Sequence, residues 1–169
     1  MRQAEAVAKR FVTVEFAALY SSDLERAVQT AEMIAKRTHH QVIPDSRLKE
    51  RNLGIFEGLT VAEIEEKFPE HAIKYKSFDP DHVIPGGESV RQFSKRIRDY
   101  FKALAQKHMG ETILVVAHGG VLNQLFKFVI NIPLDAPRNY TLLNASINIF
   151  TYADEAWRLK TWGDVSHIV

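Results

Sequence analysis

The sequence has 169 residues, 46% hydrophobic and 25% charged, values typical of one globular domain with a sizeable core. Twenty-two Lys and Arg residues against twenty-one Asp and Glu residues leave a net charge of +1, which gives no reason to expect a nucleic acid or an anionic membrane as partner. The absence of cysteine excludes disulfides, thiolate metal sites and a cysteine nucleophile.

The sequence also lacks the usual signals for a membrane or for secretion. Its longest apolar run, Thr112–Ala117, is far too short to cross a bilayer. The first five residues contain no apolar signal core. We therefore expect a cytoplasmic protein.

The first half of the chain alternates helical and strand patterns. In chain order we expect an amphipathic helix through Ala4, Val7, Ala8 and Phe11, a strand at Phe16–Tyr20, a helix at Leu24–Arg37, a strand at Val42–Pro44 and a helix at Thr60–Phe68. Ser21, Ser22 and Asp23 predict a cap for the second of these helices. Thr60 and Glu63 have the spacing of a capping box.

The second half begins with residues 69–87, whose prolines and glycines predict a surface excursion without regular structure. Ser89 then caps a long amphipathic helix with the apolar stripe Val90, Phe93, Ile97, Tyr100, Phe101 and Leu104. Residues 112–117 read as a strand buried on both faces, and His118-Gly119-Gly120 turns into a helix over 121–130. Residues 146–152 and 157–162 alternate like two strands joined by a turn.

Strands that alternate with helices indicate βαβ units and a mostly parallel sheet, so we expect one α/β domain over residues 1–169. Ligands of such sheets bind beyond the carboxyl ends of the strands. Arg26 lies there, in the first turn of a helix, where a guanidinium suits phosphate or carboxylate. The alternative is a surface arginine paired with Glu25.

His118 is a second candidate, because it stands where an apolar strand stops and a Gly-Gly turn begins. The glycines let a ligand approach the backbone, and imidazole can bind phosphate or exchange protons near neutral pH. The alternative is a structural histidine at a strand end.

The irregular segment Leu48–Gly58 could hold a carboxylate over the same pocket, where it would act as a general acid. The alternative is a solvent-exposed charged loop. The other histidines show no metal-ligand spacing, so we do not expect a zinc site.

Four segments together resemble the motifs of a known family, in the right order. Residues 21–31, SSDLERAVQTA, resemble S-x-x-x-R-A-x-x-T-A, and residues 48–58, LKERNLGIFEG, resemble L-x-E-x-x-x-G-x-x-E-G. Residues 85–89 are similar to P-G-G-E-S and residues 115–120 to V-x-H-G-G. The chain thus resembles the histidine phosphatase superfamily, in the branch of phosphoglycerate-mutase-like broad phosphatases.

The resemblance implies a three-layer α/β sandwich with a mostly parallel sheet, and an enzyme that hydrolyses small phosphorylated metabolites through a phosphohistidine. It implies that Arg26 and His118 bind the phosphoryl group, that Glu50 is the general acid and then the base, and that Gly119 and Gly120 shape the wall beside the phosphate. It implies no metal or organic cofactor. Substrate and oligomeric state stay open.

The family's R-H-G-E segment, which carries the nucleophilic histidine on the first, central strand, has no match here, because no Arg-His-Gly triplet occurs. Residues 1–4 instead resemble the G-x-Q-A helix start that follows it. We therefore expect a sheet without its central strand, an exposed apolar slot, and very weak activity. The alternatives are an inactive phosphate-binding or interaction protein, a phosphoglycerate mutase, or His118 acting as nucleophile.

Overall fold

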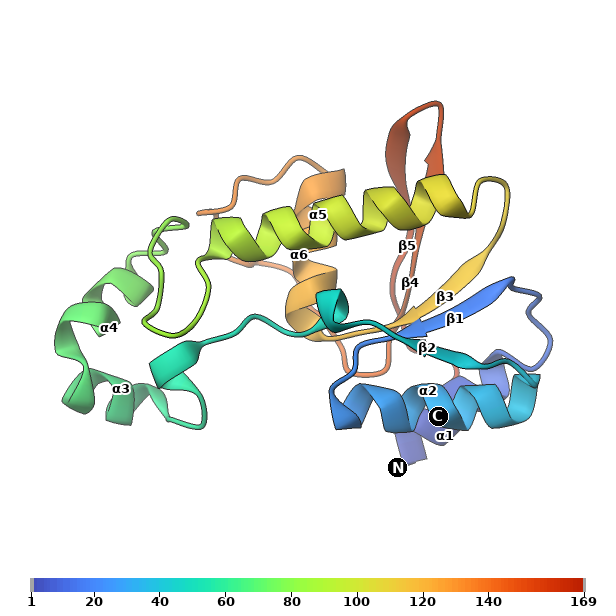
Figure 1. Ribbon diagram of the computed structural model, residues 1–169, viewed down its shortest axis with the longest axis horizontal. Coiled ribbons are helices and arrows are strands. Elements are labelled where there is room, and N and C mark those ends of the chain that lie inside the picture. Colours follow the sequence, from blue (N-terminus) through green and yellow to red (C-terminus); the bar gives the residue numbers. More distant parts are fainter. Residues whose placement is uncertain (1, 169) are drawn as a thin grey trace.

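The computed structural model describes residues 2–168 (Figure 1). Its helices are α1 (Arg2–Arg10), α2 (Glu25–Thr38), α3 (Val61–Lys67), α4 (Pro69–Lys76), α5 (Val90–Lys107) and α6 (Gly119–Val129), with short 3-10 turns at Ser46–Leu48 and Gly54–Phe56. Its strands are β1 (Ala18–Ser21), β2 (Val42–Pro44), β3 (Ile113–Val116), β4 (Ile147–Ala153) and β5 (Ala156–Asp164). The predicted α/β class is confirmed.

Three strands form a parallel sheet in the order β2-β1-β3. The central strand β1 is buried along its whole length, and Ser21 at its carboxyl end pairs with Pro44 of β2 and Val116 of β3. Helices α1 and α2 cover one face of this sheet and α5 lies on the other, which gives three layers (Figure 1). None of the helices within residues 2–168 is long and apolar enough to cross a membrane.

Successive side chains of β3 point to opposite faces of the sheet and pack into two separate hydrophobic cores. Val115 packs with Phe93 and Ile97 of α5 on one face, whereas Leu114 packs with Val7 of α1 and Ile34 of α2 on the other. Side chains of a strand alternate between faces, so a continuous apolar run serves both cores.

Strands β4 and β5 form a separate antiparallel hairpin, as their alternation predicts. Phe150 of β4 and Trp157 of β5 pack against the core beneath α5. The sheet is therefore parallel in three strands only, and no strand within residues 2–168 bridges β3 to β4.

A groove of about 530 Å³ lies between β3 and β4, lined by Leu114–Gly119, by 142–148 and by α1. The carbonyls of Thr112 and Val116 accept from Ala17 and Ser22, so residues 112, 114 and 116 direct their polar groups toward β1. Ile113 and Val115 therefore direct theirs at the groove. Both faces of β3 pack against a core, as expected, but all four residues remain partly exposed, because this edge of the strand is uncovered.

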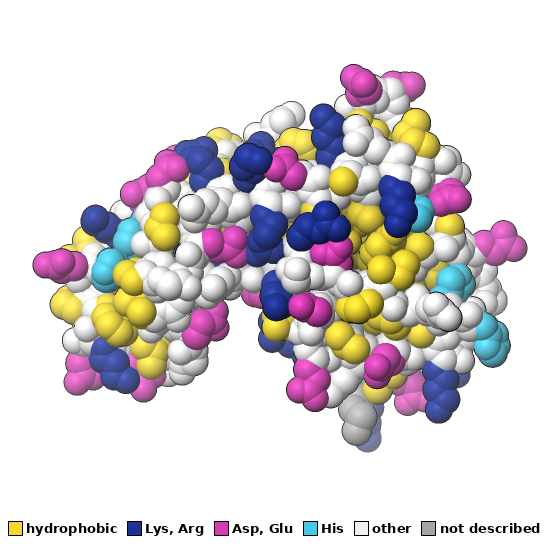
Figure 2. All heavy atoms as spheres, in the orientation of Figure 1, with side chains coloured by type: hydrophobic (Ala, Val, Ile, Leu, Met, Phe, Trp, Pro, Cys, Tyr) yellow, Lys and Arg dark blue, Asp and Glu magenta, His cyan; other side chains and the backbone are white. Residues whose placement is uncertain are grey.

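Helices α3 and α4 project from the layered body, and Figure 2 shows the surface hollowed beside this projection. Phe56, Ile64, Ala72 and Ile84 form its own small core. The prediction of an irregular excursion over residues 69–87 is confirmed for 77–87 but is wrong for 69–76, because Pro69 begins helix α4, a position that proline favours.

The predicted caps are confirmed at Thr60 and Ser89, where both capping boxes are complete. The cap predicted for α2 is wrong: Leu24 occupies the cap position and makes no side-chain hydrogen bond. Ser22 Oγ accepts from the Leu24 N–H at 3.3 Å, but its main contact is with His118.

Candidate functional site

The carboxyl ends of β1 and β3 lie side by side, and each leads into a helix that carries a predicted site residue. Arg26 is the second residue of α2, and His118 immediately precedes α6. Glu50 enters from the irregular segment between β2 and α3. All three line the groove that runs between β3 and β4, at its polar end.

Arg26 and His118 contact each other directly. The Nε–H of Arg26 donates to Nδ1 of His118 at 3.2 Å. Because a guanidinium only donates, Nδ1 accepts and the imidazole proton lies on Nε2, which is 2.7 Å from Ser22 Oγ and donates to it. His118 is 7% exposed and Ser22 is fully buried, so the ring is held in one orientation.

The environment of His118 favours the neutral ring. Burial lowers its pKa below the usual value of 6.5, and the positive charge of Arg26 lowers it further, against a smaller raising effect of Glu50. With the imidazole neutral, the guanidinium of Arg26 is the positively charged group that this end of the groove offers to an anion.

Glu50 is held by two backbone amides. Its Oε2 accepts from the Gly120 N–H at 2.8 Å, and its Oε1 accepts from the Arg51 N–H at 2.9 Å. The Gly120 amide belongs to the first turn of α6, where unpaired N–H groups favour negative charge. The carboxylate therefore caps α6 from outside the helix and lies next to His118.

The two glycines of the turn differ in what they permit. A Cβ on Gly120 would lie 1.9 Å from Glu50 Oε1, whereas a Cβ on Gly119 would meet only the end of the Leu142 side chain, at 3.0 Å. Gly120 is thus required for the carboxylate to reach the helix. Gly119 lines the groove, whereas Gly120 faces the carboxylate of Glu50.

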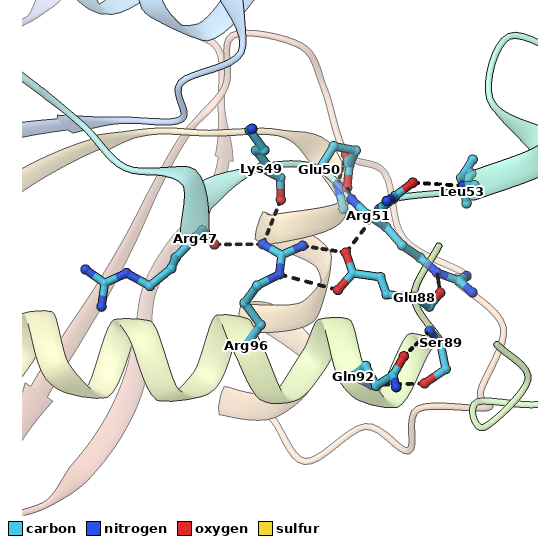
Figure 3. Close-up of polar contacts among 12 residues, drawn as sticks. Arg47, Lys49, Glu50, Arg51, Leu53, Glu88, Ser89, Gln92 and Arg96 are labelled. Atoms are coloured by element: carbon cyan, nitrogen blue, oxygen red, sulfur yellow. Dashed lines mark hydrogen bonds and ion pairs between the residues drawn. The ribbon is translucent and has the colours of Figure 1, made fainter. Parts of the chain in front are cut away.

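A second set of contacts positions the segment that carries Glu50 (Figure 3). Arg96 of α5 donates through Nη1 to the carbonyls of Arg47 and Lys49, at 2.7 and 3.1 Å, and pairs through Nη2 with Glu88 at 2.5 Å. Glu88 also accepts from the Asn52 N–H, at 3.0 Å. Residues 47–52 are therefore held to α5 on both sides of Glu50.

Sequence analysis missed three positions that support the candidate site residues. Ser22 was interpreted as a helix cap, although its hydroxyl orients His118. Arg96 and Glu88 contact the segment that carries Glu50 and not the groove itself. A single arginine in a helical sequence does not indicate such a contact. Glu88 belongs to the P-G-G-E-S motif, which sequence analysis recognised without predicting what Glu88 contacts.

Within residues 2–168 no three His, Asp or Glu side chains are grouped to hold a metal ion. The site's polar groups are instead a guanidinium, a neutral imidazole, a carboxylate and the amides of a helix start. This set can bind a phosphoryl group and exchange protons with a leaving group.

Comparisons with known proteins place the chain in one family. The profile of the histidine phosphatase superfamily (branch 1) matches residues 1–165. A metal-independent phosphoserine phosphatase from Arabidopsis thaliana is 42% identical over 99% of this chain and 70% of its own length. A probable phosphoglycerate mutase, GpmB, from Proteus mirabilis is 34% identical over 99% of this chain and 80% of its own.

Solved structures give the same result. Bacillus stearothermophilus YhfR superposes with a TM-score of 0.89 at 30% identity, over 99% of this chain and 84% of that one. A mycobacterial glucosyl-3-phosphoglycerate phosphatase, solved in complex with inorganic phosphate, gives 0.81 at 28% identity, over 99% and 86%. These likenesses confirm the predicted phosphoglycerate-mutase-like fold.

Replacing Gly120 by alanine should displace the Glu50 carboxylate, because the new Cβ occupies its place. We expect Gly120→Ala to lower the stability by about 2 kcal/mol through strain and the lost hydrogen bond. Gly119→Ala, one residue earlier in the same helix, is the matched control and should change it by less than half as much. Chemical denaturation measures both, and equal losses would contradict the assignment.

Removing Arg26 should raise the pKa of His118. Burial remains the larger cause, so we expect the ring of Arg26→Gln to titrate higher than in the parent but still below 6.5. NMR titration of the His118 ring measures this shift. Arg37→Gln, on the same helix but paired with Glu5, should leave the value unchanged.

Because the pKa of His118 is lowered in the folded protein, this residue makes the free energy of unfolding depend on pH. The unfolded chain binds the proton more readily, so this residue's contribution is complete above pH 6.5 and is lost as the pH falls through the folded-state pKa.

Truncating Arg96 should release the segment that carries Glu50. We expect Arg96→Ala to cost roughly 1–3 kcal/mol, because the Glu88 carboxylate and two carbonyls lose their partner, and to speed amide exchange at Arg51 and Asn52. Lys95→Ala, which breaks the exposed pair with Asp99 on the same helix, should cost no more than about 0.5 kcal/mol. Unchanged amide exchange at residues 51–52 in Arg96→Ala would show that the segment keeps its conformation without Arg96.

Proposed function

The chain belongs to the histidine phosphatase superfamily, and on that premise we propose that its site catalyses hydrolysis of phosphomonoesters. One observation carries the proposal: Arg26, His118 and Glu50 converge at the carboxyl ends of two parallel strands, in one groove. Arg26 and His118 bind the phosphoryl oxygens, and Gly119 and Gly120 form the wall beside them. Glu50 exchanges protons with the leaving group.

The chemistry takes two steps. A histidine nitrogen attacks phosphorus, the bond from phosphorus to the alcohol oxygen breaks, and the carboxyl group of Glu50 gives its proton to that oxygen. The Glu50 carboxylate then takes a proton from water, whose oxygen attacks the phosphohistidine. The phosphorus–nitrogen bond breaks, and phosphate and free histidine result.

His118 is poorly placed to be that nucleophile. Its Nδ1 already accepts from Arg26, and its Nε2 donates to Ser22, so neither nitrogen is free to attack phosphorus. To donate to a phosphoryl oxygen, His118 would release Arg26 from Nδ1 to the bound anion and take up a proton on that nitrogen, while Nε2 stays on Ser22. The family resemblance implies that the nucleophile belongs to an Arg-His-Gly-Glu segment, which has no match in this sequence.

The groove between β3 and β4 supports this part of the proposal. The polar backbone groups of Ile113 and Val115 face it, and its lining changes from apolar at Leu114 to polar at Arg26 and His118. A strand paired with β3 in this groove would satisfy those backbone groups and would end beside the phosphoryl site.

Hydrolysis is favoured over mutase chemistry by the phosphatase-like carboxyl end, 163–167, and by the short stretch between Gly58 and Pro85. The 42% identical relative carries the name of a phosphatase, although others are named as mutases. We expect action on a small phosphorylated metabolite in the cytoplasm, without a metal or organic cofactor.

The activity test compares two forms of the protein. The 169-residue chain should hydrolyse p-nitrophenyl phosphate very slowly, whereas a form extended at its amino end by a strand carrying Arg-His-Gly-Glu should turn over. In the extended form Arg26→Ala, His118→Ala and Glu50→Gln should each lower kcat about 100-fold or more, because each removes a group aimed at the transition state.

Arg10→Ala, on the exposed face of α1, is the control and should leave the rate of the extended form unchanged. Robust turnover by the 169-residue chain that Glu50→Gln abolishes would refute the missing nucleophile. Rates that survive Arg26→Ala and His118→Ala would remove these residues from the site.

A further inference from the structure

Two histidines meet on the projection of α3 and α4, outside the lining of the groove that holds the candidate site (Figure 1). His71 belongs to the first turn of α4, and His82 belongs to the irregular segment 77–84 that follows this helix. Their rings stack, with centroids 5.4 Å apart and planes at 29° to each other. The stacked pair therefore joins α4 to the segment that leads toward α5.

Each ring of the pair has one buried nitrogen without a hydrogen-bond partner among residues 2–168: Nδ1 of His71 and Nε2 of His82. A neutral imidazole can leave such a nitrogen unprotonated, whereas a protonated ring carries an N–H on both nitrogens. The free-energy cost of a buried polar group without a partner is larger when the group is charged. The stacked arrangement therefore favours two neutral rings.

The charged groups around His82 are mostly positive. They are Lys74 of α4 and Arg51, against one carboxylate, that of Asp79, and the ring of His71 adds a further positive charge when it is protonated. Burial lowers the pKa of His82 below its usual value of 6.5, and the basic groups beside it lower the pKa further, against a smaller raising effect of Asp79. The surroundings thus offer little compensation for a proton on the pair.

The segment 77–84 is also held from its other side, by α5. Arg91 of α5 forms an ion pair with Asp81, and its backbone N–H donates to the carbonyl of Pro80 at 2.9 Å. These contacts involve neither imidazole ring. If the two rings separated, α4 would therefore part from a segment that stays on α5.

Both sides of this junction line a cavity of about 710 Å³ beneath α3 and α4, which also has Glu50 in its lining. Tyr75 comes from α4, and Phe78 and His82 come from the segment that follows. A gap between α4 and the segment would open one wall of this cavity to water. The contact between the two rings thus decides whether that wall is closed.

We propose that the pair of His71 and His82 is a pH-sensitive latch: with both rings neutral it closes α4 onto segment 77–84, and protonation of the pair releases α4 and opens the cavity. Two cationic rings this close repel each other, and each buries an N–H without an acceptor. The open form binds protons more readily, so closure is complete above pH 6.5 and is lost as the pH falls through the lowered pKa of His82. The latch does not depend on the proposed function.

Amide hydrogen exchange of the 169-residue chain measures the opening. It is read at Ala72 and Ser77, whose N–H groups donate to the carbonyls of Phe68 and Ile73. After correction for the intrinsic pH dependence of exchange, we expect the protection of these amides to fall about ten-fold or more between pH 7.5 and pH 5. The amides of α5 report unfolding of the whole chain, to which His118 also contributes, and they serve as the reference.

The double variant His71→Phe with His82→Phe keeps two aromatic rings and removes both titrating groups. Relative to α5, its α4 amides should be equally protected at pH 5 and pH 7.5, because no charge forms in the pair and no ring nitrogen is buried without a partner. His39→Asn is the matched control and should behave as the parent does. It removes an exposed histidine at a left-handed position that asparagine tolerates.

NMR titration of the two imidazole rings in the parent gives a second measurement that needs no variant. The ring signals should change over the same pH range in which the α4 amides lose protection. Equal protection of α4 at both pH values in the parent, or a loss that survives in the double variant, would overturn the latch. Opening at a pH at which the rings have not yet titrated would overturn it too, and this comparison decides the matter if the double variant does not fold.

Discussion

The parallel pairing of β1 with β3 is the contact on which the rest of the site depends. Ser21 lies opposite Val116, so the residues that follow, Ser22 and His118, meet at the ends of the two strands. That meeting fixes the imidazole, and the imidazole in turn accepts from Arg26 at the start of α2. A slip of one residue in this register would turn the alternating side chains of β3 to opposite faces and separate the pair.

Near this contact lie a carboxylate and a guanidinium, Glu50 and Arg26, and each is bound by other groups of the protein. Glu50 is engaged by backbone amides of Gly120 and Arg51, while Arg26 donates to a neutral ring. The carboxylate and the guanidinium are thus held by different partners, and both remain available to a ligand. Farther from the groove, Arg96 binds Glu88 and the carbonyl of Arg47 and so ties the irregular segment to α5.

Two cavities share Glu50 in their lining. The groove beside β3 is also lined by Arg26 and His118, and the cavity of about 710 Å³ beneath α3 and α4 is lined by apolar and by charged side chains. The segment that carries Glu50 therefore joins the projection of α3 and α4 to the end of the sheet where Arg26 and His118 meet.

The sequence by itself determined the α/β class, the helix starts at Thr60 and Ser89, and the candidates Arg26, Glu50 and His118, because periodicity, capping boxes and ordered motifs are local properties. Helix α4 was missed, since a proline that can start a helix reads equally well as a breaker. Only the tertiary structure decided that Ser22 orients His118, that Gly120 makes room for Glu50, and that β3 has an open edge. These are contacts between residues about 70 to 96 positions apart, or between strands and whatever lies beside them, and no local pattern encodes them.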